Sequence, residues 1–156
     1  MSLKIGVISD THGLLRPGVE SCFAGVSHII HAGDIGAPEV VEALRRIAPV
    51  TAIRGNVDRG AWAKSYPDTE TLRLGGYCFY VLHDLNALSV VPADLGIDIV
   101  VSGHSHRVQI VTRDGVLYLN PGSAGRRRFK LPITLATLEL NEHRPLDPVI
   151  HDLDRV

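Results

Sequence analysis

The sequence predicts an α/β fold with a sheet that is at least partly parallel. The first observation is that apolar, β-branched runs alternate with helical spacing over the first third of the chain. The second is that the remainder is rich in strand patterns, two pairs of which flank the short turn signals Gly75-Gly76 and Asp114-Gly115. The third is a composition of 45% hydrophobic and 21% charged residues, which is typical of a globular domain.

In the first half, Leu3–Ser9 reads as a strand that ends in the polar turn Asp10–Gly13. A weak helical pattern at Pro17–Phe23 leads to a short strand at His28–His31. The segment Ala37–Ala48 has apolar residues at helical spacing, and Pro38 suits its first helical position. Val50–Arg54 reads as the next strand, which completes a βαβαβ pattern.

In the second half, the strands are expected in pairs. The expected strands are Thr69–Leu74, Tyr77–Leu82, Ile97–Ser102, Val108–Arg113, Val116–Asn120, Ile133–Leu140 and a possible last one near Val149–Leu153. A short helix is expected within Leu88–Leu95, although Pro92 limits its length. No repeat, low-complexity segment or linker interrupts the chain, so we expect one domain over residues 1–156.

The charge balance disfavours a general nucleic-acid binder. Lys and Arg number 16 and Asp and Glu number 17, which gives a formal charge of −1 and no cationic excess for a phosphate backbone. Cys22 and Cys78 are too few for a disulfide framework and suit a reducing compartment. Because no signal-peptide pattern and no apolar run long enough to span a membrane is present, we expect a cytoplasmic protein.

Metal-capable side chains follow five of the predicted strands. They are Asp10 and His12, Asp34, Asn56, His83, and finally His104 and His106. The gaps from 10 to 34, 34 to 56, 56 to 83 and 83 to 104 are 24, 22, 27 and 21 residues, each about one strand plus its connection. Since open α/β sheets place their sites at the carboxyl ends of strands, we expect these side chains to converge.

The donor set indicates the class of metal. Two carboxylates, one amide and four imidazoles suit Mn²⁺, Fe²⁺, Co²⁺, Ni²⁺ or Zn²⁺ better than Mg²⁺ or Ca²⁺, which prefer oxygen ligands. Seven ligands exceed the need of one tetrahedral ion, so two divalent ions that share a carboxylate are expected, Mn²⁺ first among the candidates. Such a pair would keep a net positive charge and attract a phosphoester.

In their order along the chain, these motifs resemble the calcineurin-like metallophosphoesterase superfamily. They are Asp10-Thr11-His12-Gly13, Gly33-Asp34, Gly55-Asn56-Val57-Asp58, His83 and Gly103-His104-Ser105-His106. The short length and Asn120-Pro121-Gly122-Ser123 resemble its small single-domain, YfcE-like phosphodiesterase branch. The resemblance implies two stacked mixed β-sheets flanked by helices, a four-layer αββα sandwich with a dinuclear centre at the strand ends.

The resemblance also implies a role for each ligand. Asp10, His12 and His106 would hold one ion, Asn56, His83 and His104 the other, and Asp34 would bridge the two. Asp34, Asn56 and His83 are the residues expected to serve catalysis directly. A metal-bound hydroxide would attack phosphorus, and the expected substrate is a small phosphoester, which the sequence does not identify further. The sequence leaves the oligomeric state open.

The sequence departs from the family at two places. Many members carry His after the Gly-Asn pair, where it protonates the leaving group, and Val57 stands there. The setting of the fourth motif is reduced to His83-Asp84-Leu85. We therefore expect preference for leaving groups that need little protonation. The rival function is a catalytically weak protein-binding scaffold of the same fold, like the retromer subunit of this branch.

For other residues the sequence leaves two roles open. His28 and His31 are expected to be structural or to support the ligands, and His143 and His151 to lie at the surface. Asn120–Ser123 is either a tight turn or a brace for a ligand loop. Arg126-Arg127-Arg128 is either a solvated patch or contains a clamp for a substrate phosphate.

Overall fold

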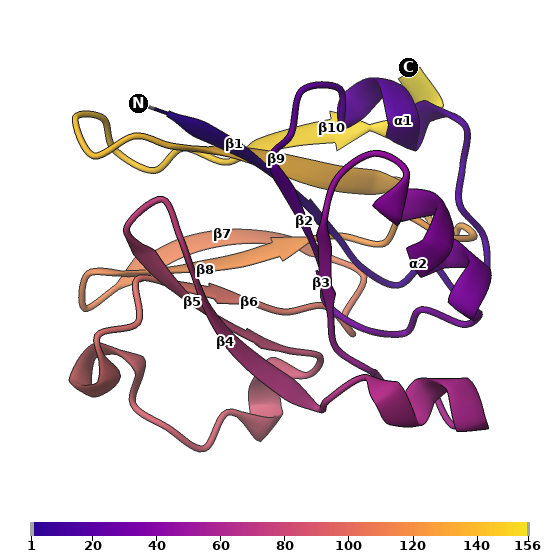
Figure 1. Ribbon diagram of the computed structural model, residues 1–156, viewed down its shortest axis with the longest axis horizontal. Helices are drawn as coiled ribbons and strands as arrows, with labels where there is room; N and C mark the ends of the chain where they lie inside the picture. The colour runs from indigo at the N-terminus through magenta and orange to yellow at the C-terminus, as the bar shows by residue number, and fades with distance from the viewer. Residues whose placement is uncertain (1, 156) are drawn as a thin grey trace.

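Two five-stranded β-sheets lie face to face in the computed structural model, which describes residues 2–155 (Figure 1). The first sheet has the order β10-β9-β1-β2-β3. Its strands are β1 (Leu3–Ile8), β2 (His28–His31), β3 (Val50–Ala52), β9 (Thr134–Leu140) and β10 (Val149–Asp152). β1, β2 and β3 are parallel, whereas β9 is antiparallel to both β1 and β10. The expectation of a partly parallel sheet is confirmed.

The second sheet is also mixed and has the order β4-β5-β6-β8-β7. Its strands are β4 (Thr69–Leu74), β5 (Tyr77–Leu82), β6 (Ile99–Val101), β7 (Val108–Arg113) and β8 (Val116–Pro121). β5, β6 and β8 are parallel, and β4 and β7 close the sheet as antiparallel edge strands. Positive φ angles at Gly75 and Gly76, and at Asp114 and Gly115, produce the two expected tight hairpins.

The outer layers differ between the sheets. The helices α1 (Gly18–Cys22) and α2 (Pro38–Arg45) cover the outer face of the first sheet. The outer face of the second sheet packs instead against the short segment that includes Leu85 and Leu88. The 3₁₀ turns of the chain are η1 (Ala61–Ser65), η2 (Leu85–Ala87), η3 (Pro92–Leu95) and η4 (Leu153–Arg155). No helix within residues 2–155 is both long and apolar enough to span a bilayer.

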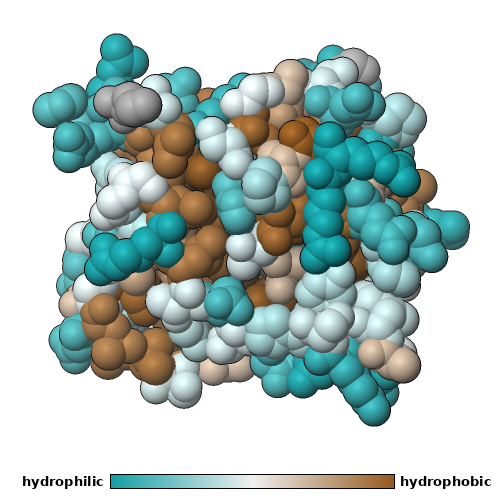
Figure 2. Space-filling model, viewed as in Figure 1, coloured by the Kyte–Doolittle hydropathy of each residue, from teal (hydrophilic) through white to brown (hydrophobic). Residues whose placement is uncertain are grey.

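Alternation along the strands separates the two cores. Ile5 and Val7 of β1 face the second sheet, whereas Ile8 faces the helices. Gly6 shares the helix-facing side, and a Cβ there would approach a ring carbon of Phe23 at 2.8 Å, so glycine lets that ring pack against β1. Figure 2 shows apolar side chains gathering between the two sheets on one side of the molecule.

Several predicted boundaries were wrong, for local reasons. The helix expected at Ala37–Ala48 ends at Arg45. The short helix expected within Leu88–Leu95 is present only as the 3₁₀ turn Pro92–Leu95, which Gly96 ends in the left-handed conformation. The strands predicted at Val50–Arg54 and Ile97–Ser102 are shorter in the structure, at Val50–Ala52 and Ile99–Val101. The turn η1 has no counterpart among the predicted elements.

Candidate metal centre

The predicted ligands follow five strands that end on the same side of the sandwich. Asp10 and His12 follow β1, Asp34 follows β2 and Asn56 follows β3 of the first sheet, while His83 follows β5 and His104 and His106 follow β6 of the second. Within each sheet these strands are parallel, so their carboxyl ends lie at one edge. The two edges meet where the sheets face each other.

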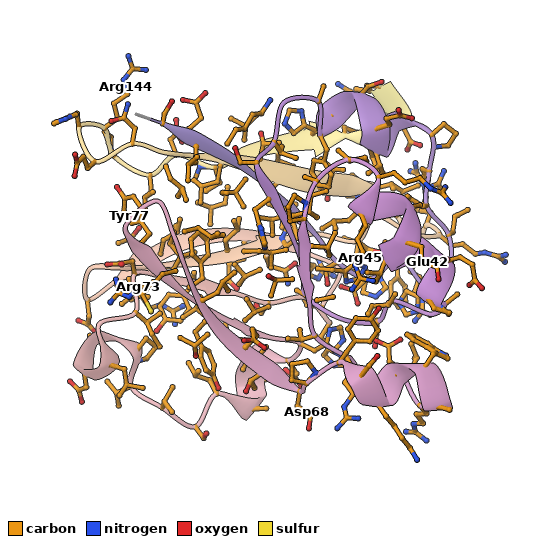
Figure 3. All side chains as sticks on the ribbon, viewed as in Figure 1. Glu42, Arg45, Asp68, Arg73, Tyr77 and Arg144 are labelled. Atoms are coloured by element: carbon orange, nitrogen blue, oxygen red, sulfur yellow. The ribbon has the colours of Figure 1, made fainter. Side chains whose placement is uncertain are left out.

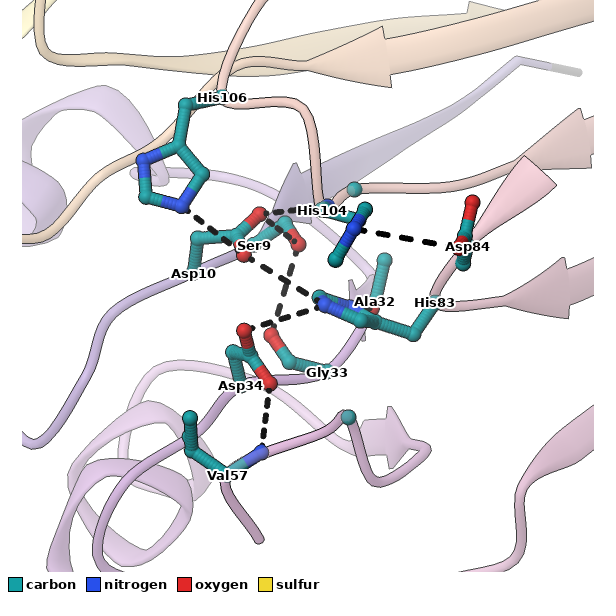
Figure 4. Close-up of polar contacts among 12 residues, drawn as sticks. Ser9, Asp10, Ala32, Gly33, Asp34, Val57, His83, Asp84, His104 and His106 are labelled. Atoms are coloured by element: carbon teal, nitrogen blue, oxygen red, sulfur yellow. Dashed lines mark hydrogen bonds and ion pairs between the residues drawn. The ribbon is translucent and has the colours of Figure 1, made fainter. Parts of the chain in front are cut away.

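Five of the seven predicted ligands converge closely, and Figure 4 shows four of them, Asp10, Asp34, His83 and His106. Nε2 of His83 lies 3.1 Å from Oδ2 of Asp34 and 3.8 Å from Oδ1 of Asp10. Nε2 of His12 lies 3.7 Å from Oδ2 of Asp34 and 3.9 Å from Oδ1 of Asp10, and Nε2 of His106 lies 3.5 Å from the latter oxygen. Asp10 thus belongs to two groups of donors, one with His12 and His106 and one with Asp34 and His83.

The donor atoms fit a cation. Oδ1 of Asp10, Nε2 of His12 and Nε2 of His83 are buried and have no hydrogen-bond partner among the described residues. Nδ1 of His83 contacts the carbonyl oxygen of Ala32 at 2.7 Å, so Nδ1–H donates there and Nε2 faces two carboxylates. A cation between these atoms would be held by Nε2 and by both carboxylates. Nitrogen and oxygen donors in this mixture suit Mn²⁺, Fe²⁺, Co²⁺, Ni²⁺ or Zn²⁺.

The pKa values of Asp34 and His83 are shifted because these charged and polar side chains lie so close together. Burial raises the pKa of Asp34, but the contact with His83, the N–H of Val57 and the charge of His12 outweigh it and lower the pKa to about 2. Burial lowers the pKa of His83, but Asp34, Asp10 and the Ala32 carbonyl outweigh it, so the net pKa is raised. Asp34 is therefore ionised at neutral pH, and its neighbourhood attracts positive charge.

The backbone at the ligands is in an uncommon conformation. The φ angles are +56° at Asp10, +48° at His12, +54° at Asp34, +71° at His104 and +62° at His106. Such left-handed conformations cost about 1–2 kcal/mol for a non-glycine residue and concentrate at functional sites. Glycines allow the loops to pack, because a Cβ at Gly55 would overlap Oδ1 of Asp34 and a Cβ at Gly103 would overlap Oγ of Ser9.

Asn56 and His104 lie at the rim instead of inside the cluster. Both residues are exposed, and His104 retains 42% of its side-chain accessibility. The ring of His104 packs edge-on against that of His83 at a centroid distance of 5.3 Å. Asn56 and His83 line the same pocket. The structure thus brings both rim residues next to His83, and their ligand roles stay predictions.

His31 supports the cluster from beneath. Its Nδ1 accepts a hydrogen bond of 3.1 Å from the backbone N–H of Gly33, so Nε2–H of the neutral ring donates to Oγ1 of Thr11 at 3.0 Å. Thr11 in turn donates to the Ile35 carbonyl at 2.9 Å. Burial lowers the pKa of His31 to about 4, which keeps the ring neutral. The supporting role left open by the sequence is the one observed.

The sequence left Asp58 without a role, and the structure gives it one. Its buried carboxylate accepts hydrogen bonds from three backbone N–H groups, those of Ile35 at 3.0 Å, Gly36 at 2.9 Å and Gly55 at 2.8 Å. These bonds join the loop that carries Asp34 to the loop that carries Asn56. The signal in the sequence was an acidic residue in the glycine-containing turn after β3.

The segment Asn120–Ser123 is also a brace. Nδ2 of Asn120 donates to the Gly103 carbonyl at 3.0 Å and to Oγ of Ser105 at 3.2 Å. Oγ of Ser123 donates to the Asp10 carbonyl at 3.1 Å. These contacts hold the loops of β1 and β6, so the second of the two roles left open is the observed one. Ser9 adds a further bond of 2.8 Å to Oδ2 of Asp10, another contact that sequence reasoning missed.

The remaining candidates lie around this centre. His28 contacts Thr51 and His151 contacts Thr137 within the first sheet, while His143 is exposed. In the arginine run, Arg127 pairs with Asp154. Burial lowers the pKa of His12, and the charge of Arg128 adds to this effect. Arg54 pairs with Asp68 at 2.7 Å.

Comparison with solved structures shows the same fold in three proteins. A conserved uncharacterised protein of Streptococcus pneumoniae, described as a phosphoesterase by inference, has a TM-score of 0.79 at 24% identity, over 99% of this chain and 91% of that one. Vacuolar protein sorting 29 of Cryptosporidium parvum has a TM-score of 0.76 at 18% identity, over 97% of this chain and 98% of that one. An archaeal phosphodiesterase has a TM-score of 0.74 at 23% identity, over 96% of this chain and 100% of that one.

Sequence comparison gives the family. A probable metallophosphoesterase of Methanothermobacter thermautotrophicus is 32% identical over 133 residues, which cover 78% of this chain and 77% of that protein. The family model of the calcineurin-like phosphoesterase superfamily domain matches residues 3–143. This match contains every predicted ligand and both sheets up to the end of β9. The chain therefore belongs to the calcineurin-like phosphoesterase superfamily.

Proposed function

We propose that this protein is a metal-dependent phosphodiesterase with a dinuclear centre. One observation carries the proposal. The carboxylates of Asp10 and Asp34 converge with imidazole nitrogens, and several of these donor atoms are buried without a hydrogen-bond partner among the described residues. Membership of a metallophosphoesterase family supports it, and so does the shared fold of the archaeal phosphodiesterase. Because vacuolar protein sorting 29 also shares the fold, the donor set carries more weight than the fold.

In this proposal the seven residues divide into two ligand sets. Asp10, His12 and His106 hold one ion, and the short distances among their donor atoms support this set. Asn56, His83 and His104 hold the other, supported by the position of all three along one side of the site. Asp34 bridges the ions, and its Oδ2 does face the rings of both His12 and His83. The ions would activate a water molecule as the nucleophile and neutralise charge on the phosphate.

The chain's own residues define the reaction further. Asp34, Asn56 and His83 would act on the substrate phosphate through the ions that they hold, and Asn56 and His83 line one pocket next to the cluster. Val57 is 49% exposed beside Asp34, and its backbone N–H donates to Oδ1 of Asp34 at 3.1 Å. Its isopropyl side chain has no proton to give a leaving alkoxide. The expected substrate is a small diester whose leaving group needs little protonation.

The native metal and the compartment belong to the same proposal. Mn²⁺ is the first candidate, since it accepts mixed carboxylate and imidazole ligands. An Entamoeba histolytica homologue of vacuolar protein sorting 29 has been solved with Zn²⁺, which supports metal binding by this fold. Cys22 and Cys78 are both free and buried, which supports a reducing cytoplasmic compartment.

The test is hydrolysis of bis(p-nitrophenyl) phosphate by chelator-treated protein before and after addition of Mn²⁺. We expect turnover only after Mn²⁺ is added, with Ni²⁺, Co²⁺ and Zn²⁺ as comparisons. Calorimetric titration of Mn²⁺ into the same protein gives the number of ions bound. Two bound ions without turnover of any diester would reject the enzyme and favour the scaffold, and no binding at all would reject the centre itself.

A further inference from the structure

A pocket of about 290 Å³ opens directly beside the proposed metal centre. We propose that this pocket selects phosphodiesters in which one substituent on phosphorus carries a cation, such as an ammonium group, and that Asp84 is the residue that recognises it. The inference rests on the proposed function and names a substrate class for it.

The pocket connects to the centre through two of the predicted ligands. His83 and Asn56 line its inner side, and Nε2 of His83 is a buried nitrogen without a hydrogen-bond partner. Asp68, Thr69 and Ala87 lie among the residues of its other sides. A diester with its phosphate at His83 and Asn56 would therefore place one of its two substituents in the pocket.

The charged side chains of the pocket leave a negative balance. Arg54 and Asp68 neutralise each other through Nε and Oδ1 at 2.7 Å and Nη2 and Oδ2 at 3.4 Å, and Figure 3 shows Asp68 where the chain enters β4. Arg59 donates to the Asn56 carbonyl and is not part of the lining. Asp84 is the remaining charge, so the pocket carries about one negative charge beside the metal ligands.

The carboxylate of Asp84 is held in place and available. Its Oδ1 accepts a hydrogen bond of 3.0 Å from the N–H of Asn86, which caps η2 and fixes the side chain. Within residues 2–155, Oδ2 accepts no hydrogen bond, and it lies 3.9 Å from Nε2 of His104 (Figure 4). Asp84 keeps 34% of its side-chain accessibility, which leaves room for a donor from a ligand.

The chemistry of the occupant follows from this geometry. An anionic substituent would meet an uncompensated carboxylate, which is unfavourable at short range, whereas an ammonium group would form an ion pair with it. Because the pair is partly exposed to water, its contribution is modest, and we expect about a fivefold preference. Substrates with a neutral substituent should fall between the cationic and anionic ones.

The experiment compares three diesters that share the same leaving group. p-Nitrophenyl phosphorylcholine, bis(p-nitrophenyl) phosphate and the p-nitrophenyl ester of thymidine 5′-phosphate all release p-nitrophenolate but retain a cationic, an aryl and a nucleoside group. With Mn²⁺-loaded protein we expect the ratio of kcat/KM for the choline ester to that for the bis-aryl ester to fall about fivefold in Asp84→Asn. Asp84→Glu keeps the charge and should retain more of the original ratio.

The matched control is Glu142→Gln, which removes the same charge from a side chain 83% exposed in the β9–β10 loop, at the opposite end of β1 from Asp10. Its ratio should stay at the wild-type value. An equal loss on all three esters in Asp84→Asn would mean that Asp84 acts through His104 and would overturn the inference. An unchanged ratio would do the same. Absence of turnover in the Mn²⁺-loaded wild-type protein would instead reject the proposed function.

Discussion

The carboxylate of Asp58 accepts a hydrogen bond of 2.8 Å from the backbone N–H of Gly55, the residue that precedes Asn56. The same carboxylate accepts the N–H groups of Ile35 and Gly36, which follow Asp34. One buried side chain thus sets the distance between two ligand loops that come from different strands. Residues of this kind orient the loops that carry metal ligands, and their mutation typically lowers metal affinity about 10- to 100-fold.

Replacement of Asp58 should therefore weaken the centre and the fold together. In Asp58→Asn one carboxylate oxygen becomes an NH₂ group that faces backbone N–H donors, and we expect a loss of about 1–3 kcal/mol in the free energy of unfolding. Mn²⁺ affinity should fall about 10- to 100-fold. Denaturant unfolding and Mn²⁺ titration measure the two effects, with the exposed Asp147→Asn as control. Unaltered Mn²⁺ affinity in Asp58→Asn would contradict the bracing role.

Replacement of Asp34 tests the bridge. Asp34→Asn keeps the size of the side chain but removes the charge that faces both His12 and His83. We expect turnover of bis(p-nitrophenyl) phosphate to fall more than about a hundredfold and the metal content to drop below that of the wild type. Elemental analysis and kinetics on the same sample measure both. Asp94→Asn, at an exposed position of η3, is the matched control, and wild-type values for Asp34→Asn would refute the bridge.

His31 should make stability depend on pH. Its folded pKa of about 4 lies below the ordinary value of 6.5, so between these values the unfolded chain binds a proton that the folded chain excludes. The free energy of unfolding should hence fall as pH falls from about 6.5 to about 4, by up to about 1.4 kcal/mol per pH unit.

Chemical unfolding of the chelator-treated protein at about pH 7 and about pH 5 measures this dependence. His31→Gln should show a smaller difference between the two conditions, because the glutamine amide does not titrate. His143→Gln, at an exposed ring, should keep the wild-type difference. The same difference in all three proteins would show that His31 is not the group responsible.

Val57 should determine which leaving groups are accepted. General acid catalysis is worth about 10²–10⁴-fold, so the wild-type protein should hydrolyse an activated aryl diester far faster than an alkyl phosphate monoester. Val57→His places an imidazole beside Asp34 and should lower the ratio of aryl-diester to alkyl-monoester turnover by at least about tenfold, whereas Val57→Ala should leave this ratio unchanged. Comparable turnover of both substrates by the wild-type protein would contradict the proposed role.

The sequence alone determined the strands and the ligand candidates, and it did so because both are local properties. The apolar, β-branched runs in Leu3–Ile8 and His28–His31 favour strands whichever partner they pair with. Gly75-Gly76 and Asp114-Gly115 specify hairpins because few other residues accept positive φ there. Element ends were less well predicted, as the end of α2 at Arg45 instead of Ala48 shows.

Only the tertiary structure decided which side chains support the ligand loops and which charges remain unpaired near the centre. Asp58 and Asn120 act through hydrogen bonds to backbone groups distant in the chain, and His31 through the side chain of Thr11, and no sequence pattern encodes such partners. The same holds for Asp84, whose charge matters because Arg54 and Asp68 neutralise each other across the pocket. Spacing predicts which loops reach the centre, but distances, burial and the pairing of charges arise only when two sheets bring their edges together.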